Sequence, residues 1–196
     1  MTRIIAGRAK GAHLETPTHA RTRPTSDRVR EALFSSLVGW MGAFDEPAEE
    51  QLSGLAVLDL FSGSGAIGLE AASRGAKPVV MVEKDAPTAK LISRNAVSTK
   101  LSVSVITSSV LSYLSNSTGQ RFDVVFLDPP YDVKNEEITK LLRLLVDGEW
   151  LVEDALVVIE RSKRDGVPEL PPVFENWERV YGDTVLHYLQ GEGSPK

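Results

Sequence analysis

The sequence predicts an α/β fold in which helices cover both faces of a mostly parallel sheet. Strand-like and helix-like patterns alternate along most of the chain of 196 residues. Such an alternation requires right-handed crossovers between parallel strands. Three of the apolar runs end in or are followed by a carboxylate, at Asp59, Glu83 and Asp128. Because ligands bind beyond the carboxyl ends of the strands in such sheets, we expect one site that contains all three carboxylates.

Residues 57–68 give the strongest signal for this site. Their apolar run ends at Asp59 and continues into a turn in which Gly63, Gly65 and Gly68 have the G-x-G-x-x-G spacing. Small residues permit a tight turn, close approach of the backbone to a ligand and close packing of helix on strand. Glu83 follows Gly63 by 20 residues, the offset at which a strand-end acid reaches a ribose. Together these features predict a nucleoside-containing cofactor.

Asp59 indicates which cofactor. The pyrophosphate of a dinucleotide lies at a helix N-terminus, where a carboxylate at the end of the same strand would repel it. S-Adenosylmethionine instead carries sulfonium and ammonium groups, which Asp59 could bind while Glu83 binds the ribose hydroxyls. The sequence thus favours S-adenosylmethionine over a nicotinamide dinucleotide. A purely structural role, in which Asp59 caps the glycine turn and Glu83 ends a solvated strand, is the alternative. The expected cofactor contacts around the turn are Asp59, Phe61, Ser62, Gly63, Ser64, Gly65, Glu83 and Lys84.

Composition excludes several functions. The chain has no cysteine, which rules out disulfides and thiol chemistry, and its three histidines lack metal-ligand spacing, so no metal is expected. No apolar segment approaches the length of a membrane span, and we expect a cytoplasmic protein. The net charge of −5 is unevenly distributed. Residues 1–40 contain seven Arg or Lys and three Asp or Glu, or +4, which leaves −9 for the rest. A basic arm on an acidic body indicates contact between the N-terminus and a polyanion.

The arm is predicted to be a β-hairpin followed by a helix. Strand-like segments at 3–7 and 12–16 flank a basic tip, and residues 24–27 have the composition of a helix start. One apolar stripe then follows the helix at Val29, Leu33, Leu37, Trp40 and Met41. For each arginine on this helix, a solvated surface is the alternative to contact with a polyanion. The candidate polyanion contacts are Arg3, Arg8, Lys10, Arg21, Arg23, Thr25, Arg28 and Arg30.

We divide the chain into an extension at 1–41, an acidic linker at 42–53, a main domain at 54–190 and a frayed tail at 191–196. Further helices are expected at 86–99, 110–114 and 135–146, and further strands at 79–82, 103–106, 122–127 and 155–160. The segments 179–181 and 185–189 flank a Gly-Asp turn, which predicts a terminal hairpin.

Asp128-Pro129-Pro130-Tyr131 is the predicted catalytic segment. Two consecutive prolines fix φ twice and remove two donors, so we expect a stiff loop whose carbonyls point outward unpaired. The Asp128 carboxylate and the Pro129 carbonyl could accept the two N–H bonds of an exocyclic base amine, while Tyr131 stacks on the base. This orientation would direct the nitrogen lone pair toward the sulfonium methyl group, and Asp128 or water would take the proton. A rigid turn with an exposed tyrosine is the alternative.

These segments resemble the bacterial RsmD family, which methylates the exocyclic N2 amine of one guanine in 16S ribosomal RNA. The resemblance rests on the segments 3–7 with Gly11, 23–31 with 33–34, 59–65, Glu83 and 128–131, and it covers nearly the whole chain. It implies a Rossmann-like class I S-adenosylmethionine-dependent methyltransferase with seven strands, the last antiparallel. It also implies 16S ribosomal RNA as partner, within a small-subunit assembly particle. We expect a monomer, without contact to a membrane.

The chain departs from the family at two places. Many related methyltransferases have an acid after the third strand that binds the adenine amine, whereas this chain has Ser108 and Ser109, and we assign Ser109 to that contact. A basic residue often follows Gly11 in the family, and here it is Ala12. Two other functions stay open: an amino methyltransferase acting on DNA, and an RNA-binding assembly factor without turnover.

Overall fold

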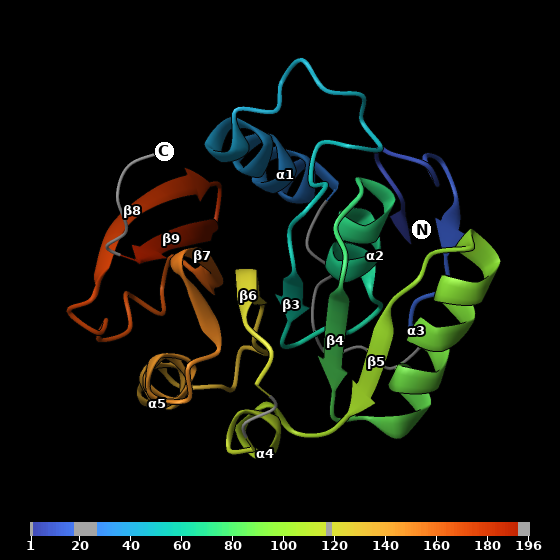
Figure 1. Ribbon diagram of the computed structural model, residues 1–196. Helices are drawn as coiled ribbons and strands as arrows, with labels where there is room; N and C mark the ends of the chain where they lie inside the picture. Colours follow the sequence, from blue (N-terminus) through green and yellow to red (C-terminus); the bar gives the residue numbers. More distant parts are fainter. Residues whose placement is uncertain (1, 18–26, 117–118, 192–196) are drawn as a thin grey trace.

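Seven strands form one sheet in the computed structural model, which describes residues 2–17, 27–116 and 119–191. The strands are β3 (Val57–Asp59), β4 (Val79–Glu83), β5 (Ser104–Thr107), β6 (Phe122–Leu127), β7 (Leu151–Ser162), β8 (Phe174–Tyr181) and β9 (Thr184–Gly191). Their order is β5-β4-β3-β6-β7-β9-β8, and of these seven strands only β9 runs against the others (Figure 1). The predicted mostly parallel, seven-stranded sheet is confirmed, including the antiparallel last strand.

Within the described residues, five helices cover the two faces of this sheet. They are α1 (Asp27–Met41), α2 (Ala66–Ser73), α3 (Ala86–Thr99), α4 (Val110–Leu114) and α5 (Asn135–Asp147). Side chains alternate between the faces along each strand. Accordingly Val57 and Phe126 belong to the core under α1, α2 and α3, whereas Leu58 and Val125 belong to the core under α4 and α5. The N-terminal helix thus shares its core with the main sheet.

Most predicted elements are confirmed, and the exceptions concern where they begin or which side they bury. The predicted ranges of α3, α4 and β6 agree with the structure. Strand β7 begins four residues before its predicted start, because Leu151 pairs with Phe122 ahead of an irregularity in the ladder. In α1, Val29, Leu33 and Leu37 are buried as predicted, together with Phe34 and Val38, while Trp40 and Met41 are only partly buried. The buried side of this helix is therefore rotated slightly from the predicted stripe at its C-terminal end.

The N-terminal hairpin is shorter than predicted. Its strands, β1 (Thr2–Arg3) and β2 (His13–Leu14), hold two residues each, because the chain between them turns toward α2. The amides of Ile5 and Ala6 donate to the buried carboxylate of Glu70, at 2.6 and 2.9 Å. At Gly7, which has a φ of +81°, a β-carbon would lie 1.9 Å from the Ser73 carbonyl oxygen. The hairpin is therefore fixed to α2 by backbone contacts. No helix in the described part of the chain is long and apolar enough to cross a membrane.

Candidate active site at the carboxyl edge of the sheet

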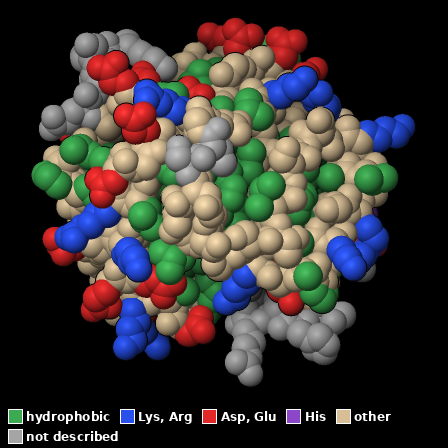
Figure 2. Space-filling view, turned by 60° about the horizontal axis from the view of Figure 1, so that its bottom comes forward, with side chains coloured by type: hydrophobic (Ala, Val, Ile, Leu, Met, Phe, Trp, Pro, Cys, Tyr) green, Lys and Arg blue, Asp and Glu red, His purple; other side chains and the backbone are tan. Residues whose placement is uncertain are grey.

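The three predicted carboxylates meet at one edge of the sheet. Strand β3 lies between β4 and β6, and Asp59 pairs with Met81 on one side and Phe126 on the other. Glu83 follows Met81 by two residues and Asp128 follows Phe126 by two residues. They therefore flank Asp59 and lie slightly beyond it in the strand direction. Figure 2 turns this edge toward the viewer and shows hydrophobic side chains in the middle of the face, with most charged side chains around its rim. The predicted position of the three carboxylates is confirmed.

Asp59 lies at the bottom of this site. Its side chain is 1% exposed, and its Oδ2 accepts a hydrogen bond of 3.1 Å from the amide of Gly68 in the first turn of α2. Burial raises the pKa of Asp59 to about 7, with a further contribution from repulsion by Asp128 and Glu83, while the Gly68 hydrogen bond opposes the shift. Asp59 therefore does cap the glycine turn. The ionised form of this buried carboxylate would be stabilised by a cationic ligand, which would lower the pKa of Asp59 again.

The glycine turn leaves an open backbone surface beside Asp59. Gly65 and Gly68 are needed for packing, because a β-carbon at either would come within 3.0 Å of the Met81 side chain on β4. Gly63 differs: it has a φ of +50°, and a β-carbon there would meet no atom within 4 Å. Its glycine allows the left-handed backbone while leaving space next to the turn. Close approach of a ligand to this turn is sterically possible.

Glu83 connects the glycine turn with the start of α3. One of its carboxylate oxygens accepts the amide of Gly63 at 3.0 Å, and the other accepts the amide of Asp85 at 2.8 Å. Each oxygen keeps a second lone pair, so ribose hydroxyls could still donate to it. Lys84, the next residue, is exposed. Glu83 thus has a structural role in the turn and keeps the capacity to bind a diol.

Two serines follow β5 beside Glu83. The amide of Ser108 donates to the Glu83 carbonyl at 3.1 Å. Ser109 caps α4, since its Oγ accepts the amide of Ser112 at 3.1 Å. An adenine amine is a donor and needs an acceptor, which the capping oxygen of Ser109 supplies poorly. The Ser108 hydroxyl donates to the Ser109 carbonyl and keeps its own lone pairs, so Ser108 is the better acceptor.

The segment Asp128–Tyr131 forms the other wall of the site. Pro129 is buried, Asp128 is partly buried, and the Tyr131 side chain is 61% exposed. The prediction that all carbonyls of this loop are unpaired is wrong for Pro130, which accepts the amide of Val133 at 3.0 Å in a turn. In the described residues no backbone hydrogen bond to the Pro129 carbonyl is found. The loop therefore offers one carboxylate, one carbonyl and one exposed ring at the same edge.

Arg161 at the end of β7 holds this loop, and no sequence motif identifies it. Its side chain is 4% exposed, donates to the Val133 carbonyl at 3.1 Å and forms an ion pair of 3.5 Å with Asp165. Asn135, the first residue of α5, donates to the Asp165 carbonyl at 2.6 Å. The loop is thus attached to β7 and to the turn that follows β7. An arginine near the end of an apolar strand is the one sequence signal that could have indicated this role.

The predicted RNA contacts fall into three groups. Arg3, Arg8, Lys10 and Arg28 are exposed, as an RNA contact requires. Arg30 is buried: it donates to the Arg3 carbonyl and to Asp27 Oδ1, so in this structure it joins α1 to β1 and does not face solvent. Burial lowers the pKa of Arg30. The remaining three predicted contacts, Arg21, Arg23 and Thr25, lie outside the described residues.

Asn95 links the N-terminal arm to the glycine turn. The side chain is 1% exposed and lies on α3. Its Oδ1 accepts the amide of Glu15 at 2.9 Å, and its Nδ2 donates to the carbonyls of Glu15 at 3.0 Å and Ser64 at 3.1 Å. One buried amide therefore contacts both the end of the hairpin and the glycine turn. Sequence reasoning did not find this residue, because its partners are 31 and 80 positions away.

Several known proteins are similar to this chain in sequence and fold. The family model described as "Conserved hypothetical protein 95" matches residues 2–190. The ribosomal RNA small subunit methyltransferase D of Escherichia coli K12 is 33% identical over 195 residues, which cover 97% of this chain and 90% of the relative. The chain belongs to the RsmD family. Its Haemophilus influenzae member is 37% identical over 179 residues, or 89% of this chain and 84% of the relative.

A solved structure supports the same assignment. The putative methyltransferase yhhF from Escherichia coli superposes with a TM-score of 0.82 at 30% identity, covering 98% of this chain and 99% of that chain. The seven-stranded sheet of this RsmD family member is thus the Rossmann-like sheet of class I methyltransferases. The protein is a methyltransferase by family and by fold, and its relatives are named for ribosomal RNA.

Proposed function

We propose that the protein transfers a methyl group from S-adenosylmethionine to the exocyclic N2 amine of a specific guanine in 16S ribosomal RNA, within a small-subunit assembly particle. The observation that carries the proposal is the arrangement of Asp59 between Glu83 and Asp128 at one sheet edge. The buried carboxylate of Asp59 favours a cationic ligand. The partly buried carboxylate of Asp128, in a loop stiffened by two prolines, favours an amine that donates hydrogen bonds. The names of the relatives supply the class of RNA.

The residues of the site fit this cofactor. Asp59 would hold the positive methionine end, Glu83 the ribose, and the open surface at Gly63 would contact the bound molecule through its backbone. Phe61, Ser62, Ser64 and Gly65 complete the turn, and Ser108 or Ser109 would take the adenine amine. When bound, S-adenosylmethionine supplies an electrophilic methyl group at a positively charged sulfur.

Asp128 and Pro129 would orient the acceptor. An exocyclic guanine amine has two N–H bonds, and the carboxylate and the carbonyl can each accept one, which directs the nitrogen lone pair away from the base plane. The nitrogen becomes acidic only as it gains the methyl group, so Asp128 takes the proton late or passes it to water. Tyr131, with its exposed ring, would stack on the base. Most of the rate enhancement would then come from orientation.

The test is transfer of label from S-adenosylmethionine to small-subunit particles and to deproteinised small-subunit RNA, both from cells that lack the enzyme. Duplex DNA serves as a third substrate. Nuclease digestion and mass spectrometry locate the label. We expect a single N2-methylguanine as the product. The rate of methyl transfer should fall at least about 100-fold in Asp128→Asn. It should be unchanged in the control Asp132→Asn, which alters an exposed aspartate of the same loop.

Three outcomes would contradict the proposal in different ways. Label in duplex DNA alone would indicate a DNA amino methyltransferase. Label at another atom of the RNA would refute the N2 assignment while keeping the enzyme class. No transfer, together with full rescue of particle assembly by Asp128→Asn, would indicate a noncatalytic assembly factor.

A further inference from the structure

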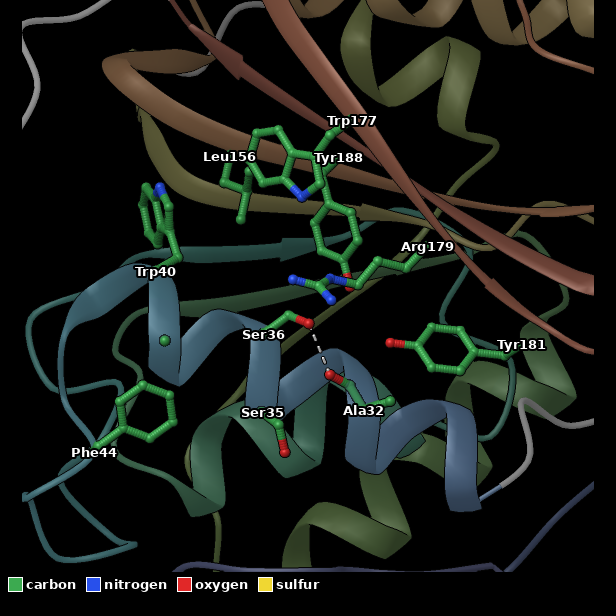
Figure 3. Close-up of a pocket in the computed structure, with 11 residues that line it drawn as sticks. Ala32, Ser35, Ser36, Trp40, Phe44, Leu156, Trp177, Arg179, Tyr181 and Tyr188 are labelled. Carbon is green, nitrogen blue, oxygen red and sulfur yellow. Dashed lines mark hydrogen bonds between the residues drawn. The ribbon is translucent and has the colours of Figure 1, made fainter.

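A cavity of about 610 Å³ lies away from the cofactor turn, between α1 and the hairpin of β8 and β9. Figure 3 shows its walls: Trp40 on α1 and Phe44 after it stand on one side, and Trp177, Arg179 and Tyr181 of β8 stand on the other. We infer that this cavity is a second RNA site, which binds one unpaired nucleotide of the substrate by base stacking and by a contact between Arg179 and its phosphate. The inference rests on the proposed function for the identity of the RNA.

The walls of the cavity are aromatic and accessible. Trp177 is 38% exposed and Phe44 is 69% exposed, although both are large apolar side chains. The Trp177 ring is stacked on the buried Tyr188, with centroids 5.3 Å apart and an angle of 4° between the planes. Its orientation is therefore fixed before a ligand binds. A preset, exposed aromatic ring is the platform on which the bases of single-stranded RNA stack.

The floor of the cavity leaves room for a planar group. The residues that α1 contributes there include Ala32, Ser35, Ser36 and Gly39, all of them small. The Ser36 hydroxyl donates to the Ala32 carbonyl at 3.0 Å, and the Ser36 and Tyr188 hydroxyls are polar groups that line this part of the cavity. A base needs such polar groups at its edge in addition to a stacking surface.

The charge of the cavity favours an anion. Of the 11 described residues that line it, Arg179 alone is charged. Its guanidinium points into the cavity beside the Tyr188 hydroxyl, and no ion pair with Arg179 is found in the part of the chain that the structure describes. A planar π-system with an attached anion satisfies both the rings and the guanidinium, and a nucleotide is the ligand class with these two parts.

The position of the cavity suits an RNA strand that also reaches the active site. Leu127 pairs with Ile159, so Asp128 is level with Glu160 of β7. Glu160 pairs with Leu186, and Leu186 pairs with Arg179. Arg179 is therefore level with Asp128 but three strands away, or about 14 Å at the usual spacing of strands. An extended single strand spans this distance in a few nucleotides, and the exposed Arg28 lies one turn before Ala32 on the same helix.

The three tryptophans allow a test that is independent of methyl transfer. Trp40 and Trp177 line the cavity, whereas Trp150 is buried under the other face of the sheet and donates to the Leu114 carbonyl. Indole N–H signals of the 15N-labelled protein would be followed during titration with uridine 5′-monophosphate, with excess S-adenosylhomocysteine present to fill the cofactor site. We expect the Trp40 and Trp177 signals to shift and the Trp150 signal to stay. If inorganic phosphate shifted the Trp40 and Trp177 signals as much as the nucleotide does, the cavity would bind anions only, and the inference of a stacked base would be wrong. If millimolar nucleotide caused no shifts, the whole inference would be overturned.

The second arm measures methylation kinetics with particles. Trp177→Ala and Arg179→Gln should each raise KM for the RNA substrate roughly tenfold with little change in kcat, as loss of one base stack or one phosphate contact predicts. Trp177→Phe should keep most of the affinity. Arg121→Gln, which changes an exposed arginine away from the cavity, is the matched control. If the substitutions raised KM for particles but not for deproteinised RNA, the cavity would bind a protein of the particle, and the proposed nucleotide site would be refuted. Nucleotide shifts without any methyl transfer would instead refute the proposed function alone.

Discussion

The two walls of the candidate active site are built in different ways. On the cofactor wall, Asp59 accepts the amide of Gly68 at the start of α2, and Glu83 accepts the amides of Gly63 and Asp85 in the turns that follow β3 and β4. On the acceptor wall, Asp128 belongs to a loop that is held by Arg161, from a strand that ends more than 30 residues further on. Local sequence therefore determines the cofactor wall, whereas tertiary packing determines the acceptor wall. Substitutions should separate cofactor binding from catalysis along this division.

The largest effect is expected at Asp59. Asp59→Asn removes the charge that would face the cationic cofactor, and we expect affinity for S-adenosylmethionine to fall about 100-fold, a loss of about 3 kcal/mol. The stability of the cofactor-free protein should change in the opposite direction and increase in Asp59→Asn. The pKa of Asp59 is raised from its ordinary value of 3.8 to about 7 by burial, so the folded state retains a proton between these two pH values. Stability then falls as pH rises through this window, by about 4 kcal/mol at most.

Calorimetry and thermal unfolding measure both consequences of this substitution. At pH 8, where wild-type Asp59 is ionised, Asp59→Asn should be more stable than the wild type and should lose the downward slope of stability between pH 4 and pH 7. If Asp59→Asn bound S-adenosylmethionine more weakly and were also less stable than the wild type, the carboxylate would act mainly as a cap for α2. The main argument for a cationic ligand at Asp59 would then be lost.

The second largest effect is expected at Arg161. Arg161→Met keeps most of the volume but releases the Val133 carbonyl and Asp165, and we expect kcat to fall about 30-fold through misorientation of Asp128 and Pro129. Cofactor affinity, measured by calorimetry, should stay within about twofold because that wall is separate. Arg164→Met, an exposed arginine three residues further on, is the control. Equal losses in kcat and cofactor affinity would contradict the division into two walls.

The same division explains what the sequence could predict. Strand ends, the glycine turn and the offset to Glu83 are local patterns, and they are enough to place Asp59, Gly63 and Glu83 together at one edge of the sheet. Arg30 is predicted to contact RNA because its charge suggests exposure, but the helix face that meets β1 depends on the packing of a hairpin 27 residues earlier. Arg161 and Asn95 act through partners distant in sequence, and a single chain without long-range information carries no pattern for them.

A third effect is expected from pH. If the cofactor binds the ionised form of Asp59, whose pKa is raised to about 7 by burial, affinity should rise several-fold between pH 6 and pH 7 and level off above pH 8. Binding should release protons when measured in buffers of different ionisation enthalpy. In Asp59→Asn the affinity should be independent of pH over this range. A pH profile that persists in this variant would show that a group other than Asp59 causes the titration.

The smallest effect is expected at Asn95, where the cofactor wall and the N-terminal arm are joined. Asn95→Ala removes the bonds to Glu15 and Ser64, so we expect cofactor affinity and RNA affinity each to weaken about threefold, as loss of a neutral hydrogen bond predicts. If the arm and the cofactor turn act through this amide, RNA should strengthen cofactor binding in the wild type, and the substitution should abolish that increase. Calorimetry with and without RNA measures it. Arg94→Ala removes only an exposed ion pair to Glu15 and should leave the increase intact, since such pairs contribute little. If both variants lost the RNA-dependent increase in cofactor affinity equally, the coupling would depend on the position of the whole arm and not on the Asn95 amide.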